Sequence, residues 1–277
     1  MLKRFLASAA FAVMLGIQSI SLLAEDLVID FKSKQSGSFG SVSYTVTAYY
    51  SSQYHLRKYH NSREDDLTDY VNSVKYHINH GEKTIKKYTL EDAIKYDEVL
   101  AKAKLDMPEK FEINLDEEMK HFISMEENID ELMRKLIDEN NEPTVKKTGA
   151  EKVLKRKCDK WKASLGNIIS LEVSLDPTLI PPEPQNIEVD RVLTNALSKV
   201  TMRLSEKARN PDGGTTLKRQ AKVLIWSKVL KLEEEATRVV QGPIPASVFE
   251  LPKGYTMEDE GKKKLEKLIE TLAGMTR

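Results

Sequence analysis

The 277-residue chain has only one cysteine, Cys158, so no disulfide can form within it. It also lacks an excess of charge, because 43 lysines and arginines balance 43 aspartates and glutamates. A near-neutral chain has no long-range field that would draw it to polyanions, so we expect no general nucleic-acid binding. Without cross-links, stability has to come from a hydrophobic core, which about 250 residues are enough to form. We expect Cys158 to be a buried, inert thiol, with an intermolecular disulfide as the alternative.

Long apolar runs are missing everywhere except at the N-terminus. Lys3 and Arg4 precede an apolar stretch from 5 to 17 that closes in Leu-Leu-Ala at 22–24, the order typical of a secretory signal peptide. The stretch is too short to favour a retained membrane anchor. Cleavage after Ala24 would leave 41 basic and 43 acidic side chains and expose Glu25, which cannot be lipid-modified as a cysteine could. The sequence therefore predicts a periplasmic or secreted protein, residues 25–277, that does not span a membrane after cleavage.

The motifs of catalysis and cofactor binding are also absent. The five histidines have no paired spacing such as His-Glu-x-x-His, so no metal site is predicted; they are His55, His60, His77, His80 and His121. There is no Gly-x-Ser-x-Gly elbow and no phosphate-binding glycine loop. Cys158 lies among lysines, but no histidine can be named as its base. We therefore predict no catalytic residues, no cofactor and no enzymatic activity.

The N-terminal third has the alternation of antiparallel strands. Between 41 and 50, apolar residues at even positions alternate with mostly polar ones, which indicates a strand with one buried face. Further strands are predicted at 27–31, 54–59, 71–78 and 82–88, with the charged stretch 62–68 read as a break.

Two helices are predicted next. Thr89 and Asp92 form a capping box that opens a helix to about 104, and Asn114 with Glu117 opens a second helix from 114 to 140. The second helix belongs to an acidic segment, 109–142, with 12 acids and 4 bases, whereas 146–162 has 8 bases and 2 acids. This asymmetry indicates either an acidic helix face near a basic strand or a dedicated docking surface.

Strands return after Pro143. The segments 145–148 and 151–157 precede a hairpin of 161–165 and 169–175 around Gly166-Asn167, which is the strongest hairpin signal in the chain. A proline cluster at 181–184 interrupts the sheet, and an amphipathic helix is predicted from 186 to 209. The segment 217–241 fits a helix or a strand equally well, 243–254 reads as a loop, and 256–273 as a helix. The pattern as a whole predicts an α+β fold with antiparallel pairing.

Three stretches carry a resemblance to a known family. They are Lys146–Gly149 leading to Lys157–Trp161, the strand Leu171–Ser174, and the segment from Pro243 to Tyr255 with its Phe-Glu-Leu-Pro-Lys-Gly-Tyr ending. The chain resembles a family of uncharacterised bacterial envelope proteins that are similar in fold to the lipoprotein carriers LolA and LolB. The resemblance implies a single domain, 25–277, built as an incomplete β-barrel: a curved antiparallel sheet with helices over its concave side. The resemblance also implies that 217–241 forms two strands. The acidic segment at about 109–142 has no counterpart in the family pattern, so we expect it to be a helical insertion.

The leading functional hypothesis is a carrier whose concave face binds a hydrophobic ligand, such as a lipid, an acyl chain or a lipoprotein. Aromatic side chains would supply the walls of the binding site, and the candidates are Tyr44, Tyr50, Trp161 and Trp226. The opposing interpretation is that these rings simply fill the core. A second hypothesis is an envelope interaction or assembly factor that binds another envelope protein through the acidic helix 114–140.

Overall fold

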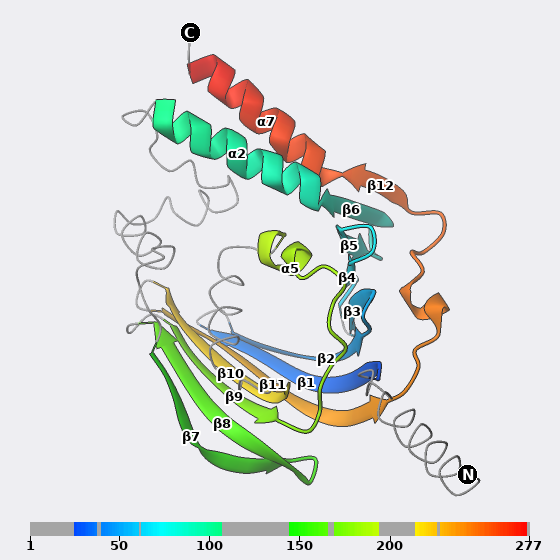
Figure 1. The fold of residues 1–277 in the computed structure, drawn as a ribbon, viewed down its shortest axis with the longest axis vertical. Helices are drawn as coiled ribbons and strands as arrows, with labels where there is room; N and C mark the ends of the chain where they lie inside the picture. Colours follow the sequence, from blue (N-terminus) through cyan, green and yellow to red (C-terminus); the bar gives the residue numbers. More distant parts are fainter. Residues whose placement is uncertain are drawn as a thin grey trace, which may run out of the picture.

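The computed structural model describes residues 25–37, 40–60, 62–106, 144–165, 169–193, 214–225 and 228–275. These residues form one 12-stranded sheet with helices on its concave side (Figure 1). The strands are β1 (Leu27–Gly37), β2 (Gly40–Tyr50), β3 (Tyr54–Tyr59), β4 (Glu64–Asp69), β5 (Val74–Asn79), β6 (Thr84–Thr89), β7 (Thr144–Val153), β8 (Arg156–Leu165), β9 (Ile169–Asp176), β10 (Thr215–Ile225), β11 (Lys228–Gln241) and β12 (Thr256–Asp259). The helices are α2 (Leu90–Asp106), α5 (Glu188–Val192), the 3-10 turn η1 (Ala246–Phe249) and α7 (Glu260–Met275).

The strand order is β12-β6-β5-β4-β3-β2-β1-β11-β10-β9-β8-β7. All pairs are antiparallel except β12 with β6, and β12 and β7 are the two edges, so the sheet does not close on itself. The sheet bends strongly, α5 lies inside the bend, and α2 and α7 lie side by side across its upper end (Figure 1). The predicted fold class, α+β with a curved and incomplete antiparallel barrel, is confirmed. Within the described residues, no helix combines the length and the apolarity that crossing a membrane requires.

Several predicted elements are found where the sequence placed them. Strands at β2, β3 and β6 are confirmed, and the ambiguous segment 217–241 forms β10 and β11. The capping box at the start of α2 is present: the Asp92 amide donates to Thr89 Oγ1 at 3.1 Å, and Thr89 Oγ1 donates to Asp92 Oδ2 at 2.5 Å.

Several predictions were wrong. The segment 151–157, predicted as one strand, contains the turn at Leu154 and Lys155 between β7 and β8, and 71–73, predicted as the start of a strand, is a turn before β5.

The charged stretch 62–68 is not a break, because 64–69 forms β4. Two of its acids bind histidines: Asp66 contacts His77 of β5, and Asp65 contacts His80 in the turn after β5. Residues 256–259, predicted as helix, instead form β12 beside β6, and α7 begins only at Glu260. The helix 114–140, the turn 166–167 and most of the helix 186–209 lie outside the described residues.

The half of the sheet formed by β2 to β6 has an apolar core on its outer face. There, buried side chains of β3 to β6 pack under the segment 243–255, with Phe249 of η1 at the centre; the cluster is Leu56, Leu67, Ile78, Ile85 and Phe249, flanked by Tyr49, Tyr54, Tyr76, Ile244, Val248, Leu251 and Tyr255. Since side chains alternate along a strand, the opposite, concave face of this half carries the polar positions.

Candidate functional site on the concave face

The register of the strands defines which residues share the concave face. Lys75 and His77 of β5 line a cavity beneath α2, α5 and α7, which fixes their side of the sheet as the concave one. Cross-strand partners lie on the same face. The cross-strand pairs run from β5 through β4 and β3 to β2. They place six further residues on the concave face: Thr68, Asp66, His55, Arg57, Tyr50 and Ala48.

The other half of the concave face is apolar. Ala48 pairs with Ile29 of β1, and Ile29 pairs with Val239 of β11, so the face continues into a buried cluster. This cluster joins strands β1, β2, β7, β8, β10 and β11 with the chain after β9, and its members are Leu27, Ile29, Phe31, Val46, Ala48, Val153, Cys158, Leu179, Leu217 and Ala236. The predicted apolar inner surface thus exists in this half but not in the half formed by β3 to β6.

Between the two halves lies a buried ion triad. Glu234 of β11 accepts hydrogen bonds from Arg57 of β3 at 2.6 Å and from Arg219 of β10 at 2.5 Å, and Ser33 donates to the same carboxylate at 3.0 Å. Burial by itself would raise the pKa of Glu234, but the two guanidinium groups outweigh it and hold the pKa below its ordinary value. The carboxylate is therefore ionised and fixes three strands to one another.

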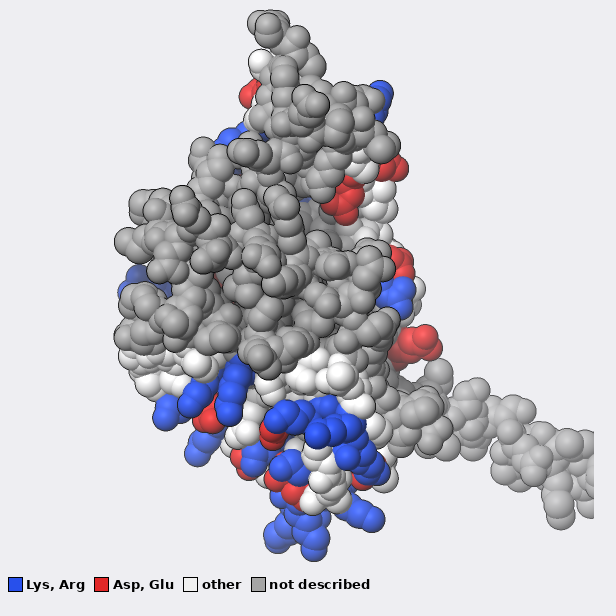
Figure 2. Space-filling model, turned by 90° about the vertical axis from the view of Figure 1, so that its left-hand side faces the viewer, with Lys and Arg blue, Asp and Glu red and all other residues white. Residues whose placement is uncertain are grey.

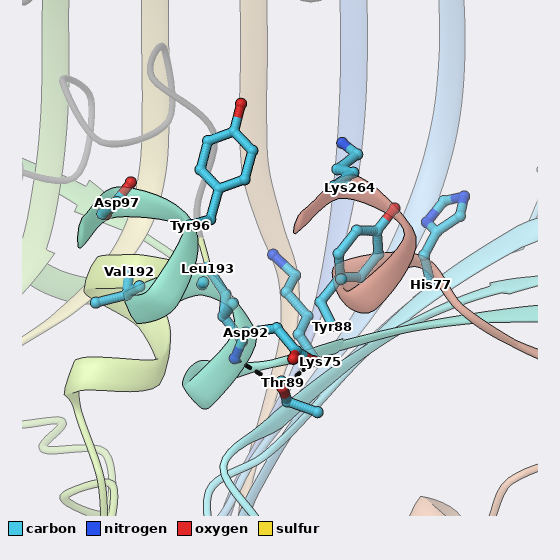
Figure 3. A pocket seen from close by; sticks show the side chains of 12 residues that line it. Lys75, His77, Tyr88, Thr89, Asp92, Tyr96, Asp97, Val192, Leu193 and Lys264 are labelled. Carbon is cyan, nitrogen blue, oxygen red and sulfur yellow. Dashed lines mark hydrogen bonds between the residues drawn. The ribbon is translucent and has the colours of Figure 1, made fainter. Parts of the chain in front are cut away.

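The cavity has a volume of about 500 Å³ and lies between the β5–β6 end of the sheet and the three helices (Figure 3). Its residues come from five elements. They are Lys75 and His77 from β5, Tyr88 and Thr89 from β6, Asp92, Ala93, Tyr96 and Asp97 from α2, Val192 and Leu193 from α5 and its end, and Gly261 and Lys264 from α7. Figure 3 shows Tyr88 and Lys264 on one side, Val192 and Asp97 on the other, and Lys75 reaching up from the sheet between them.

The cavity combines apolar walls with charged groups. Lys264 lies over the Tyr88 ring, with its Nζ 5.7 Å from the ring centroid, and Tyr88 is the cross-strand neighbour of Lys75. Within the described part of the chain, Lys75 makes no hydrogen bond or ion pair, and it is half-buried. His77 is held by Asp66, 3.0 Å from its Nδ1, and this hydrogen bond raises the pKa of the imidazole. Such a site suits an amphiphile, because it offers both apolar surface and an available cation.

The three aromatic candidates in the described residues lie on the concave face and do not line this cavity. Tyr44 and Tyr50 pack against the apolar cluster; Tyr44 lies 6.0 Å from the Tyr59 ring, and Tyr50 stacks on His55 at 4.6 Å. Trp161 of β8 pairs with Val173 on the concave side and is partly buried. Trp226 lies outside the described residues. The structure brings Tyr44 and Tyr50 to one half of the face but does not gather the candidates into one pocket.

Two buried ring nitrogens in the described residues have no hydrogen-bond partner, Nε2 of His55 and Nε1 of Trp161. Burial, together with the cations Arg57 and Lys75, lowers the pKa of His55 to about 3, so this ring is neutral.

Cys158 is fully buried, as predicted, and burial raises the pKa of its thiol.

The sequence missed the cavity residues because they come from five separate elements. Lys75 and His77 stand at alternate positions of β5, which marks them as sharing a face, but no sequence pattern indicates that the face turns inward. In the described residues, no cluster of three or more histidine, cysteine or acidic side chains could hold a metal ion.

No protein-family model and no curated protein matches the chain. Among solved structures, it is similar to an uncharacterized conserved protein from Thermus thermophilus, with a TM-score of 0.43, 4% identity, and coverage of 86% of this chain and 92% of that chain. It is also similar to a putative outer membrane lipoprotein-sorting protein domain from Vibrio parahaemolyticus, with a TM-score of 0.32, 8% identity, and coverage of 86% of this chain and 95% of that chain. A third similar structure is a LolA superfamily protein from Nitrosomonas europaea, with a TM-score of 0.28, 5% identity, and coverage of 84% of this chain and 93% of that chain.

Proposed function

We propose that the protein is a non-enzymatic carrier, exported to the periplasm or secreted, that binds a hydrophobic or amphiphilic molecule such as a lipid or an acyl chain on its concave face. The observation that carries the proposal is the cavity under α2, α5 and α7, which combines apolar and aromatic side chains with charged ones and has Lys75 at its base. Its volume of about 500 Å³ lies within the range of small-molecule sites. Each methylene that such a cavity takes from water contributes about 0.8 kcal/mol to binding.

The aromatic residues that were predicted as walls keep a secondary role in this proposal. Tyr44, Tyr50 and Trp161 border the apolar half of the concave face, where a long acyl chain would extend from the cavity. Trp226 remains a candidate from the sequence alone.

The test is ligand capture by the full protein. Native mass spectrometry of protein purified from its own host should show a bound lipid-sized adduct, and a fluorescent fatty acid should bind and be displaced by unlabelled fatty acids or phospholipids. Leu193→Trp fills part of the cavity, so we expect affinity to fall at least ten-fold. The matched control is Ile187→Trp, in the same segment but 41% exposed and outside the cavity. Protein that carries no adduct and ignores added lipids would refute the proposal.

The alternative, an envelope interaction or assembly factor that uses the acidic helix 114–140, concerns residues outside the described part of the chain. It remains a prediction from sequence. Deletion of 114–140 that leaves partner capture unchanged would eliminate it.

A further inference from the structure

The tip of the β7–β8 hairpin is a concentrated cationic surface. Residues 152–157 read Lys-Val-Leu-Lys-Arg-Lys, with four bases and no acid, and we call them the basic tip. Lys152, Lys155 and Lys157 are exposed and make no ion pair with any described residue, whereas Arg156 is bound to the buried Asp176 at 2.8 Å. Lys and Arg side chains gather at this lower end of the molecule (Figure 2).

Three features of the basic tip are unfavourable for folding. Lys152 and Lys157 lie directly opposite each other in the ladder, and like charges in that position repel. The turn residues Leu154 and Lys155 have φ angles of 52° and 64°, in the left-handed region where glycine or asparagine would cost less. Leu154 is 40% exposed. Edge strands often carry lysines that prevent strand pairing, which accounts for Lys152 on the edge strand β7. It does not account for Lys157 on the inner strand β8 or for Leu154 in the turn.

The presence of residues that destabilise the hairpin is explained if the basic tip binds a partner outside the protein, because strained residues cluster at binding sites. Exposed cations that have no ion partner in the described residues attract an anionic one. An exposed leucine between them favours an anionic surface with an apolar interior, which is a lipid bilayer, over a soluble polyanion.

We propose that the basic tip docks the protein on an anionic phospholipid surface, with Lys152, Lys155 and Lys157 against the headgroups and Leu154 at the level of the acyl boundary. The docking surface lies at the opposite end of the sheet order from the β5–β6 cavity, so it functions whether or not the cavity binds a ligand. Each lysine near such a surface strengthens binding about five-fold, and three together strengthen it roughly a hundred-fold.

The test is sedimentation of the full protein with vesicles. We expect it to bind vesicles of equal parts phosphatidylcholine and phosphatidylglycerol in 50 mM NaCl, to bind pure phosphatidylcholine vesicles far less, and to be released by 1 M NaCl. The variant Lys152→Glu/Lys155→Glu/Lys157→Glu should lose at least a hundred-fold in partition coefficient while its circular dichroism spectrum is unchanged.

The matched control is Lys83→Glu/Lys102→Glu/Lys253→Glu, which makes the same change in net charge at exposed lysines elsewhere. It should retain more than a third of the binding. The variant Leu154→Asn, which keeps every charge, should weaken binding several-fold. The proposal is overturned if the parent protein does not sediment with phosphatidylglycerol vesicles, if both triple variants lose binding equally, or if the protein binds heparin but not vesicles.

Discussion

At the scale of single residues, a few charged groups on the concave face contribute more to stability than the many exposed charges elsewhere. Glu234 is 5% exposed and neutralises two arginines from two other strands. A buried charge whose partner is removed costs several kcal/mol, whereas an exposed charge contributes little. The acidic and basic residues of this protein are therefore not interchangeable, although they are equal in number.

Replacing Glu234 with alanine should lower the free energy of unfolding by about 2–3 kcal/mol, because Arg57 and Arg219, whose side chains are 20% and 30% exposed, would remain partly buried without a counter-charge. Urea denaturation followed by circular dichroism measures the loss. Glu233→Ala, at the exposed neighbouring position, should change stability by no more than about 0.5 kcal/mol. Similar losses for the two variants would show that the triad is not a stabilising unit.

His55 should make the protein sensitive to mild acid. Its pKa in the folded protein is about 3, below the unfolded value of about 6.5, so the unfolded chain takes up the proton first. Stability should fall by up to about 1.4 kcal/mol per pH unit as the pH drops below 6.5 and continue to fall toward 3. The carboxyl of Glu234, whose pKa is depressed in the folded protein, adds a loss that begins as the pH falls below its ordinary pKa of 4.5 and is complete below its own depressed pKa.

Melting temperatures of the parent and of His55→Gln, measured from pH 7.5 to 4.5, check this assignment. The glutamine variant should have the flatter profile between pH 6.5 and 5. His60→Gln serves as the control, since that ring lies at an exposed position. Parallel profiles for the parent and His55→Gln would exclude His55 as the source of the acid sensitivity.

At the scale of elements, the β7–β8 hairpin has a turn of a type that its residues do not favour. Two central residues with positive φ define the turn expected of Asn-Gly, and here they are Leu154 and Lys155. The left-handed conformation costs roughly 1–2 kcal/mol for an ordinary residue.

Substituting Asn-Gly at these two positions should therefore raise the free energy of unfolding by about 1–2 kcal/mol. Thermal and urea denaturation measure the gain. The control is Lys155→Ala, which removes the charge but keeps a side chain in the strained position, and it should leave stability within about 0.5 kcal/mol. A destabilised Asn-Gly variant would mean that Leu154 contributes packing that outweighs its backbone cost.

At the scale of the whole molecule, the sheet has apolar packing on opposite faces of its two halves. Around β1, β10 and β11 the apolar side faces inward, whereas β3 to β6 face their apolar side outward and rely on the segment 243–255 to cover it. The segment also leads into β12 and α7, so it connects the outer core to the helices over the concave face.

Phe249→Ala should consequently cost about 3–4 kcal/mol, because it empties the centre of the outer core where the ring stacks on Tyr54 at 4.9 Å. The adjacent exposed substitution Glu250→Ala should be nearly neutral. Hydrogen exchange should show protection of β6 and β12 falling together in the Phe249 variant, since the segment 243–255 holds both. Loss of protection confined to the substituted residue would contradict this coupling.

The sequence by itself determined the local features of this protein. Alternation along 41–50, the Thr89–Asp92 capping box and the burial of the lone Cys158 depend on neighbouring residues or on composition, and each was predicted correctly. Only the tertiary structure decided which way each face of the sheet turns, because alternation fixes two faces but does not say which one is concave. For the same reason the ion triad of Arg57, Arg219 and Glu234 and the cavity around Lys75 could not be found from sequence: their members are far apart along the chain, and the curvature of the sheet brings them together.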